Sequence, residues 1–267
     1  MCSLRWQTNL TQISAFLYKI WLITKKRVFH VFEILFWPAI GLISVGLLTQ
    51  FLDLGPDMIA FILIGVIALG VVQIGQLDIS YVILYSVWNK SLKQELAAPI
   101  NMFHLVAGSW IMGIIHSLLV FCLVCLFSFY AFGFRVFDHG FTPLVLFYLG
   151  LVLTSAVVGT TVCALAFRFG GRAHVGATSI VSIMILFSGI YYPVEVLPQP
   201  LKTLAEFIPL THFLEFFRAS YGFPTSTKNP LINGFLLVVV YLVLAIGAML
   251  AAVHHSKKTG ILLKMSE

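Results

Sequence analysis

Charged side chains are scarce in this sequence. Aspartate, glutamate, lysine and arginine together make up 10% of its 267 residues, whereas soluble domains contain about 25%. Hydrophobic residues make up 60%, and the mean hydropathy is +1.01. A water-soluble core cannot bury so much apolar surface, so lipid must be the solvent of this chain. Its long apolar runs exclude a barrel of short alternating strands and favour a polytopic helical membrane protein.

Several catalytic signatures are missing as well. The sequence has no G-x-x-x-x-G-K-[ST] loop, and its glycine-rich piece at 170–179 (GGRAHVGATS) has no lysine to reach a phosphate. It has no H-E-x-x-H motif, no G-x-S-x-G motif and no carboxylate cluster with metal-ligand spacing. We therefore expect no catalytic, cofactor, metal or nucleic-acid site, and any ATP used must be bound by a separate subunit.

Cysteine is also rare, with four residues in the whole chain. Cys122 and Cys125 form a C-x-x-C pair, but no second pair or histidine cluster accompanies them, so they are interpreted as buried membrane cysteines. A cleavable signal peptide is not expected. The first 28 residues carry five cationic residues and no short apolar core with a small-residue cleavage site.

Six apolar runs predict six transmembrane helices in an all-α integral membrane fold. About 20 helical residues are needed to cross the hydrocarbon core. The run at 58–88 would be about 46 Å long at 1.5 Å per residue, so it should tilt or project into the cytosol. The expected spans are 31–52, 58–88, 102–130, 143–167, 175–192 and 231–253.

The cationic residues predict the orientation of these spans. Six spans place both termini on one side, and that side holds twelve of the sixteen lysine and arginine residues. By the positive-inside rule, both termini are expected in the cytoplasm of a multi-pass cell-membrane protein.

Residues 9–28 are expected to form a helix on the membrane surface. Leu10, Ile13 and Leu17 repeat at helical spacing, and Lys25 and Lys26 lie at its cationic end. The alternative is a plain basic flank that sets topology.

Residues 193–229 interrupt the pattern before the last run. Gly189 and Pro193 break an apolar helix, and further prolines separate the segments 201–207 and 210–221. Both segments are too apolar for a free loop, so we expect short helices that re-enter the membrane edge. Irregular backbone at that depth is tolerated where protein or a watery cavity surrounds it.

This interruption carries a family resemblance. S-G-x-Y-Y-P-V-E-x-L-P at 188–198, P-L-T-H at 209–212 and E-x-x-R from Glu215 to Arg218 resemble the segment before the last span of type-2 ABC exporter permeases. The resemblance implies a single transmembrane permease domain over 1–267, with re-entrant helices on the extracellular side. It also implies a second permease copy, expected as a homodimer, and cytosolic ABC ATPase subunits.

The segment 89–101 is similar to the coupling helix of that family, which lies between spans two and three. The family pattern is L-x-x-E-L-x-x-A-P, and the sequence LKQELAAP at 92–99 is similar to it. A short amphipathic helix of this kind can dock in a groove of a soluble partner. An ordinary polar loop is the alternative. The resemblance assigns coupling to the ATPase to Leu92, Lys93, Gln94, Glu95, Leu96 and Pro99.

Polar residues in the second run are candidates for a translocation path. Gln73, Gln76 and Asp78 lie within two turns, and a carboxylate at membrane depth is costly unless it faces protein or water. Alternatively, Asp78 lies near the cytoplasmic headgroups and pairs with a lysine. His116 in the third run is interpreted as a hydrogen-bonding residue between helices.

The break itself supplies the other path candidates, Tyr191, Tyr192 and Glu195. For Tyr191 and Tyr192, the alternative is a place in an interfacial aromatic belt. The charged residues near the break are expected to pair with one another or to cap the short helices; they are Glu195, Glu206, Glu215 and Arg218.

These features favour an exporter subunit for a drug-like amphiphile, a lipid or a lipid-linked glycan. A membrane-embedded lipid-modifying enzyme would need acids, histidines or lysines clustered at one depth. A channel or ion-coupled carrier would need several intramembrane charges or paired broken helices. The sequence does not distinguish between the cargoes.

Overall fold

The computed structural model describes residues 14–15, 17–22, 25, 28–91 and 102–259. The regular elements in these ranges are helices, and no strand occurs within them. The helices longer than 20 residues are α2 (Val28–Phe51), α3 (Pro56–Trp88), α5 (Met102–Phe132), α6 (Phe141–Phe169) and α10 (Pro230–Thr259).

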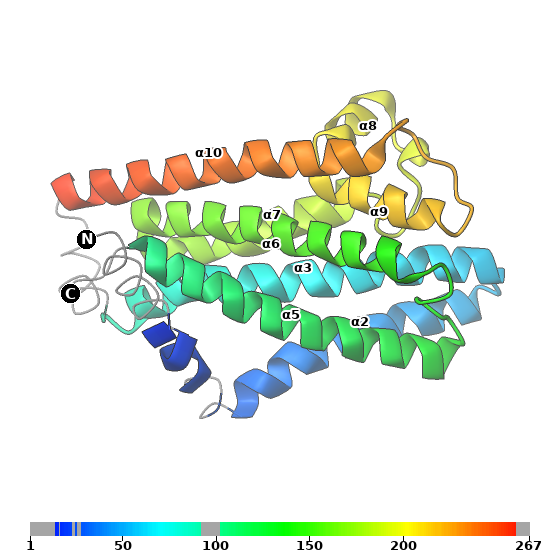
Figure 1. The fold of residues 1–267 in the computed structure, drawn as a ribbon, viewed down its shortest axis with the longest axis horizontal. Coiled ribbons are helices and arrows are strands. Elements are labelled where there is room, and N and C mark those ends of the chain that lie inside the picture. The colour runs from blue at the N-terminus through cyan, green and yellow to red at the C-terminus, as the bar shows by residue number, and fades with distance from the viewer. Residues whose placement is uncertain (1–13, 16, 23–24, 26–27, 92–101, 260–267) are drawn as a thin grey trace.

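The long helices lie side by side, and the short helices α8 and α9 lie together at one end (Figure 1). The short elements are η1 (Gly170–Ala173), α7 (His174–Phe187), η2 (Val194–Val196), α8 (Gln199–Glu206) and α9 (Pro209–Ala219). Of these, α8 and α9 lie at the end opposite to the C-terminal end of α10 (Figure 1). We call the two ends of the bundle the α9 end and the far end.

The helix α3 lies at the centre of the bundle. It packs against α2, α5 and α6, while α10 packs against α6 and α9. In the most apolar part of each helix, 67% of the residues of α3 are buried but 17% of those of α10. Such an exposed apolar surface is expected of a helix that faces lipid.

Five stretches of the described chain are long and apolar enough to cross a membrane. Four coincide with the predicted spans 31–52, 58–88, 102–130 and 231–253. The remaining stretch, Phe141–Phe187, contains 47 residues and combines α6, the turn η1 and α7. The count of six separate spans therefore stays a prediction.

The turn η1 folds α7 back along the bundle. Gly170 has a φ of +66°, a value that glycine adopts without a steric cost. The His174 ring contacts the Trp88 ring at the C-terminal end of α3, with centroids 5.7 Å apart. At the other end, Ile190 lies next to Gly65, near the start of α3. The chain between His174 and Ile190 thus runs antiparallel to α3.

The helix α7 ends five residues earlier than the predicted span 175–192. Its last residue is Phe187, and Gly189 then adopts a φ of +70°. The sequence placed this break at Gly189 and Pro193, but the apolar side chains as far as Tyr192 extended the predicted span beyond it.

The predicted surface helix 9–28 is helical at 14–15, 17–22 and 25, and α2 begins at Val28. Its position on a membrane surface stays a prediction. Residues 92–101 of the predicted coupling segment lie outside the described residues.

Candidate functional site

The described residues predicted for the site lie in two parts of the bundle, one in the middle of α3 and one at the α9 end. In the middle of α3, the helix α5 approaches closely. A Cβ atom added to Gly113 of α5 would lie 3.1 Å from the carbonyl oxygen of Gly75 in α3. Small residues allow such a close crossing of membrane helices.

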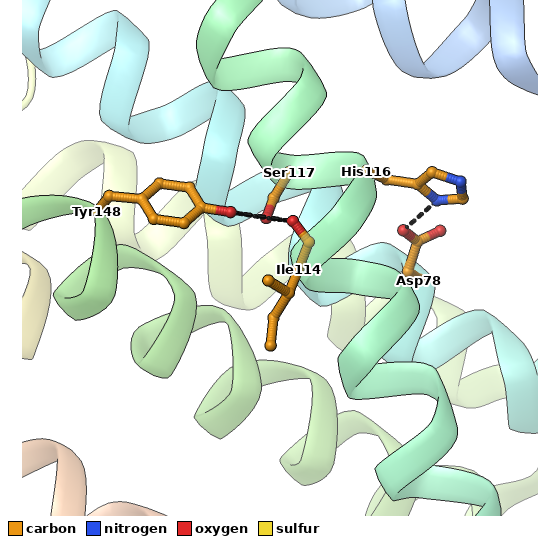
Figure 2. Close-up of polar contacts among 5 residues, drawn as sticks. All are labelled: Asp78, Ile114, His116, Ser117 and Tyr148. Carbon is orange, nitrogen blue, oxygen red and sulfur yellow. Dashed lines mark hydrogen bonds and ion pairs between the residues drawn. The ribbon is translucent and has the colours of Figure 1, made fainter. Parts of the chain in front are cut away.

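Asp78 and His116 meet beside this crossing (Figure 2). His116 Nδ1 lies 2.7 Å from Asp78 Oδ2, and the two side chains are 9% and 10% exposed. In the described residues, the partner of Asp78 is therefore His116 of α5 rather than a lysine at the headgroups. This contact links α3 to α5 through side chains 38 positions apart in sequence.

A second polar contact joins α5 to α6 nearby. The Tyr148 hydroxyl donates to the carbonyl oxygen of Ile114 over 2.9 Å and lies 3.1 Å from Ser117 Oγ (Figure 2). Ser117 also bonds to the Ile114 carbonyl oxygen. The middle of the bundle thus holds polar contacts between α3 and α5 and between α5 and α6.

The two glutamines predicted with Asp78 have different surroundings. Gln76 is 1% exposed, and its Oε1 accepts a hydrogen bond of 3.3 Å from Ser80. Gln73 and Asp78 instead line a cleft of about 40 Å³ between α2 and α3, together with Glu33, Trp37 and other residues. The structure therefore brings Gln73 and Asp78 into one cleft and leaves Gln76 in the packing between helices.

At the α9 end, Arg218 binds backbone carbonyl groups. Its Nη1 donates to Gly189 over 2.6 Å, and its Nη2 donates to Ile190 over 2.8 Å and to Phe61 over 2.9 Å. Its guanidinium carbon also lies 3.4 Å from the centre of the Phe61 ring. These contacts join α9 to α3 and to the chain after α7. We call them the Arg218 anchor.

The predicted pairing of Arg218 with an acid is thus replaced by backbone contacts. Gly189 and Ile190 follow the end of α7, where carbonyl groups no longer have partners within the helix. Burial lowers the pKa of Arg218 to about 9, although Glu215 opposes this effect. Burial also raises the pKa of Glu215 above its ordinary value.

The three path candidates at the break are also separated. Glu195 is exposed and accepts a hydrogen bond from Ser226, and it lines a cavity of about 80 Å³ together with Glu215 and Arg218. Tyr191 packs against the hydrophobic core, and the Tyr192 hydroxyl donates to the carbonyl oxygen of Leu186.

Sequence reasoning missed Ser188 and Thr211, which also line this cavity. Both are small hydroxyl residues inside the motifs S-G-x-Y-Y-P and P-L-T-H, and no pattern in a single sequence shows that they meet. The predicted coupling residues cannot be placed, because Leu92 to Pro99 lie outside the described residues.

Comparisons with known proteins connect this arrangement to transport. The inner membrane transport permease YadH of Escherichia coli is 23% identical over 189 residues, which cover 71% of this chain and 72% of YadH. The capsule polysaccharide export inner-membrane protein CtrC of Neisseria meningitidis is 33% identical over 89 residues, a third of each chain. An uncharacterised protein of Archaeoglobus fulgidus is 46% identical over 54 residues, which cover 20% of this chain and 84% of that protein.

The family described as "ABC-2 type transporter" matches residues 11–221. The match includes α2 to α9, and hence both the Asp78–His116 contact and the Arg218 anchor. Members of this family are transport permeases, and the family implies an ABC ATPase as a general partner. The chain belongs to the ABC-2 type transporter family of membrane permeases.

Proposed function

We propose that this chain is the membrane subunit of an ATP-powered exporter, and that two copies form the translocation path. A separate subunit hydrolyses the ATP. The observation that carries the proposal is the family match over residues 11–221 in a chain whose sequence has no phosphate-binding loop. CtrC is named as an export protein, which supports the outward direction.

The proposed topology has six crossings, with both termini in the cytoplasm. The antiparallel course of α7 along α3 supports counting α6 and α7 as separate crossings. The α9 end then lies outside the cell, and α8 and α9 form the re-entrant segment. This orientation agrees with the twelve lysine and arginine residues that the sequence assigns to the side of the termini.

Cysteine labelling tests this topology. In a chain with its four native cysteines replaced, Lys202→Cys on α8 should react with an impermeant reagent added from outside. Lys93→Cys should react after the membrane is opened. Labelling of Lys202→Cys from the cytosol alone would contradict the six-crossing arrangement.

The proposed path uses the cleft between α2 and α3 and the break after α7. Gln73 and Asp78 are the path residues in the middle of the bundle, and Tyr191, Tyr192 and Glu195 are those near the exit. Gln76 is given a packing role instead, because its side chain is 1% exposed. The second copy would cover the exposed apolar face of α2, which includes Phe36, Trp37 and Leu47.

The proposed conformational change driven by ATP begins at residues 92–99, which follow α3 and precede α5 in the sequence. Closure of the ATPase subunits would push this segment. Since the Asp78–His116 contact ties α3 to α5, a force on the connection would move both helices together. Coupling of this kind is reciprocal, so cargo should change nucleotide binding in return.

ATP turnover of the purified complex tests the coupling. The tagged chain should co-purify with an ABC ATPase, and Glu95→Arg should weaken this association or reduce turnover. Glu206→Arg is the matched control, because Glu206 is an exposed acid on α8 at the α9 end. If Glu95→Arg leaves association, turnover and transport at wild-type levels, residues 92–99 have no coupling role.

No observation on the described residues favours the alternative of a membrane-embedded enzyme. Among the described residues, no group of three or more histidine, cysteine, aspartate or glutamate side chains is arranged to hold a metal. The family match favours transport over enzyme catalysis.

A further inference from the structure

We propose that the cavity at the α9 end binds an uncharged, hydroxyl-bearing group of the saccharide type. This inference rests on the proposed function and adds the chemical class of the cargo at the exit. We call the site the α9 cavity. Its walls are formed by α3, the chain after α7, α9 and the chain after α9. It is lined by Met58, Phe61, Ser188, Pro193, Val194, Glu195, Thr211, Glu215, Arg218, Phe223 and Pro224.

The cavity has an exposed rim and a buried polar wall. Met58, Glu195 and Pro224 are exposed at the rim. Ser188, Thr211 and Arg218 are 1%, 2% and 4% exposed. A group that entered past the rim would therefore meet polar side chains that are already shielded from solvent.

Three residues that line the cavity each have a buried hydrogen-bonding atom that lacks a partner in the described part of the chain. These atoms are Ser188 Oγ, Thr211 Oγ1 and Arg218 Nε. Many hydroxyl groups in the helices of this protein donate to a carbonyl oxygen of the preceding turn, as Ser109 and Thr154 do. Buried polar groups rarely remain without a partner, so three such atoms at one cavity indicate that something polar occupies it.

The Arg218 anchor accounts for the other nitrogen atoms of this arginine. Nη1 and Nη2 bind the carbonyl oxygens of the anchor, whereas Nε has no partner in the described part of the chain. The anchor therefore fixes the guanidinium group through three of its five N–H groups and leaves the Nε–H without a partner in the described part of the chain. Together with two hydroxyl groups, the wall provides three donors, two of which can also accept.

The charges of the lining favour an uncharged occupant. Glu195 and Glu215 oppose an anion, and the buried guanidinium of Arg218 opposes a cation. A sugar hydroxyl can accept from Arg218 Nε and donate to a carboxylate at the same time. The lining thus matches a group that carries several neighbouring hydroxyls.

The apolar part of the lining fits the same class. Phe61 and Phe223 meet edge to face, with ring centroids 5.3 Å apart, and both line the cavity. Aromatic rings of this kind give an apolar surface for the C–H groups of a sugar ring. A volume of about 80 Å³ would hold roughly five waters, which suits the hydroxyl-bearing edge of one sugar unit rather than a lipid chain.

Saturation-transfer NMR on the full-length chain in lipid nanodiscs tests the proposal. The probes are methyl glucoside and N-acetylglucosamine, with inorganic phosphate and choline as charged competitors. We expect saturable binding of at least one sugar and no displacement by phosphate or choline. Thr211→Val should weaken sugar binding by about two- to tenfold, because it removes one hydrogen-bonding group.

Thr211→Ser is the matched control, because it keeps the hydroxyl and should bind like the wild type. The variant Ser188→Ala distinguishes a loss of sugar binding from a loss of stability. Removing an unpartnered hydroxyl should leave thermal stability unchanged or improved, yet it should weaken sugar binding. The absence of saturable sugar binding would overturn the proposal, and so would stronger binding of phosphate or choline. Equal sugar binding by Thr211→Val and the wild type would also overturn it.

The same preparation separates this inference from the proposed function. The binding measurement needs no ATPase, whereas the exporter proposal depends on co-purification and ATP turnover. A chain that couples to an ATPase but binds no sugar would refute the saccharide site alone. A chain that binds sugar but recruits no ATPase would refute the exporter proposal.

Discussion

The two polar regions of this bundle differ in how they compensate a buried charge. In the middle of the bundle, the Asp78 carboxylate meets one titratable side chain, His116. At the α9 end, the guanidinium of Arg218 meets three backbone carbonyl groups. The side-chain contact ties α3 to α5 but leaves the two helices able to move as a pair, whereas a charge held by the main chain of two segments fixes the backbone itself. We therefore assign movement to the first region and rigidity to the second.

The largest effect should come from breaking the Arg218 anchor. Arg218→Met would leave three buried carbonyl groups without this donor, and we expect a loss of about 3 kcal/mol or more in the free energy of unfolding. Arg218→Lys should lie between this variant and the wild type, because an ammonium cannot reproduce the planar fork of the guanidinium. Thermal unfolding in detergent measures both variants. A wild-type melting temperature for Arg218→Met would show that the anchor does not hold the α9 end.

The next largest effect on stability should come from replacing Gly65, where α3 contacts the chain after α7. A Cβ atom at this position would overlap the carbonyl oxygen of Ile190. Gly65→Ala should therefore cost about 1–3 kcal/mol of unfolding free energy by overpacking. Gly41→Ala in α2 is the matched control, because its Cβ would meet no atom within 4 Å, and alanine should stabilise that helix by up to about 1 kcal/mol. Equal melting temperatures for the two variants would contradict the tight contact at Gly65.

A double-mutant cycle should then measure the Asp78–His116 contact. His116→Leu and Asp78→Asn should each destabilise the chain, and the double variant should lose less than the sum. We expect a coupling energy of about 0.5–3 kcal/mol, as found for side chains in direct contact. Asp57→Asn, in the exposed first turn of α3, is the control and should cost under about 1 kcal/mol. Additive effects within error would mean that the two side chains do not interact.

The smallest effect should be the pH dependence of Glu215. Burial raises the pKa of this carboxyl, so the folded state binds a proton more tightly than the unfolded state. The stabilisation from this carboxyl is therefore fully present below the unfolded pKa of about 4.3, and it is lost as the pH rises through the folded value. Glu215→Gln should flatten this part of the stability profile. Unfolding midpoints measured across this range check the sign, and an unchanged slope would exclude Glu215 as its source.

Much of the fold could be predicted because apolar periodicity and length carry most of the signal. The predicted run 58–88 differs from α3 by two residues at its start, since Pro56 suits the first turn of a helix. The end of α7 was missed because hydropathy does not register the positive φ of Gly189. The break itself was predicted, because glycine and proline are read from local sequence.

The candidate sites were harder to predict, because their contacts join residues far apart in the chain. Asp78 was identified as a costly carboxylate, but its partner is 38 residues away. Arg218 was expected to pair with an acid or to cap a short helix, whereas it bonds to Phe61 across 157 residues and to carbonyl groups that carry no residue-specific signal. No arrangement of side-chain types in the sequence could have indicated that target.

The choice of acceptors at Arg218 has a consequence for how this protein can evolve. Every amino acid brings the same main-chain oxygen, so a replacement at position 61, 189 or 190 does not by itself delete the acceptor that the guanidinium uses. The hydrogen bonds therefore depend on the side chain of residue 218 alone. The residues at the three acceptor positions can be replaced as far as space and backbone angles allow.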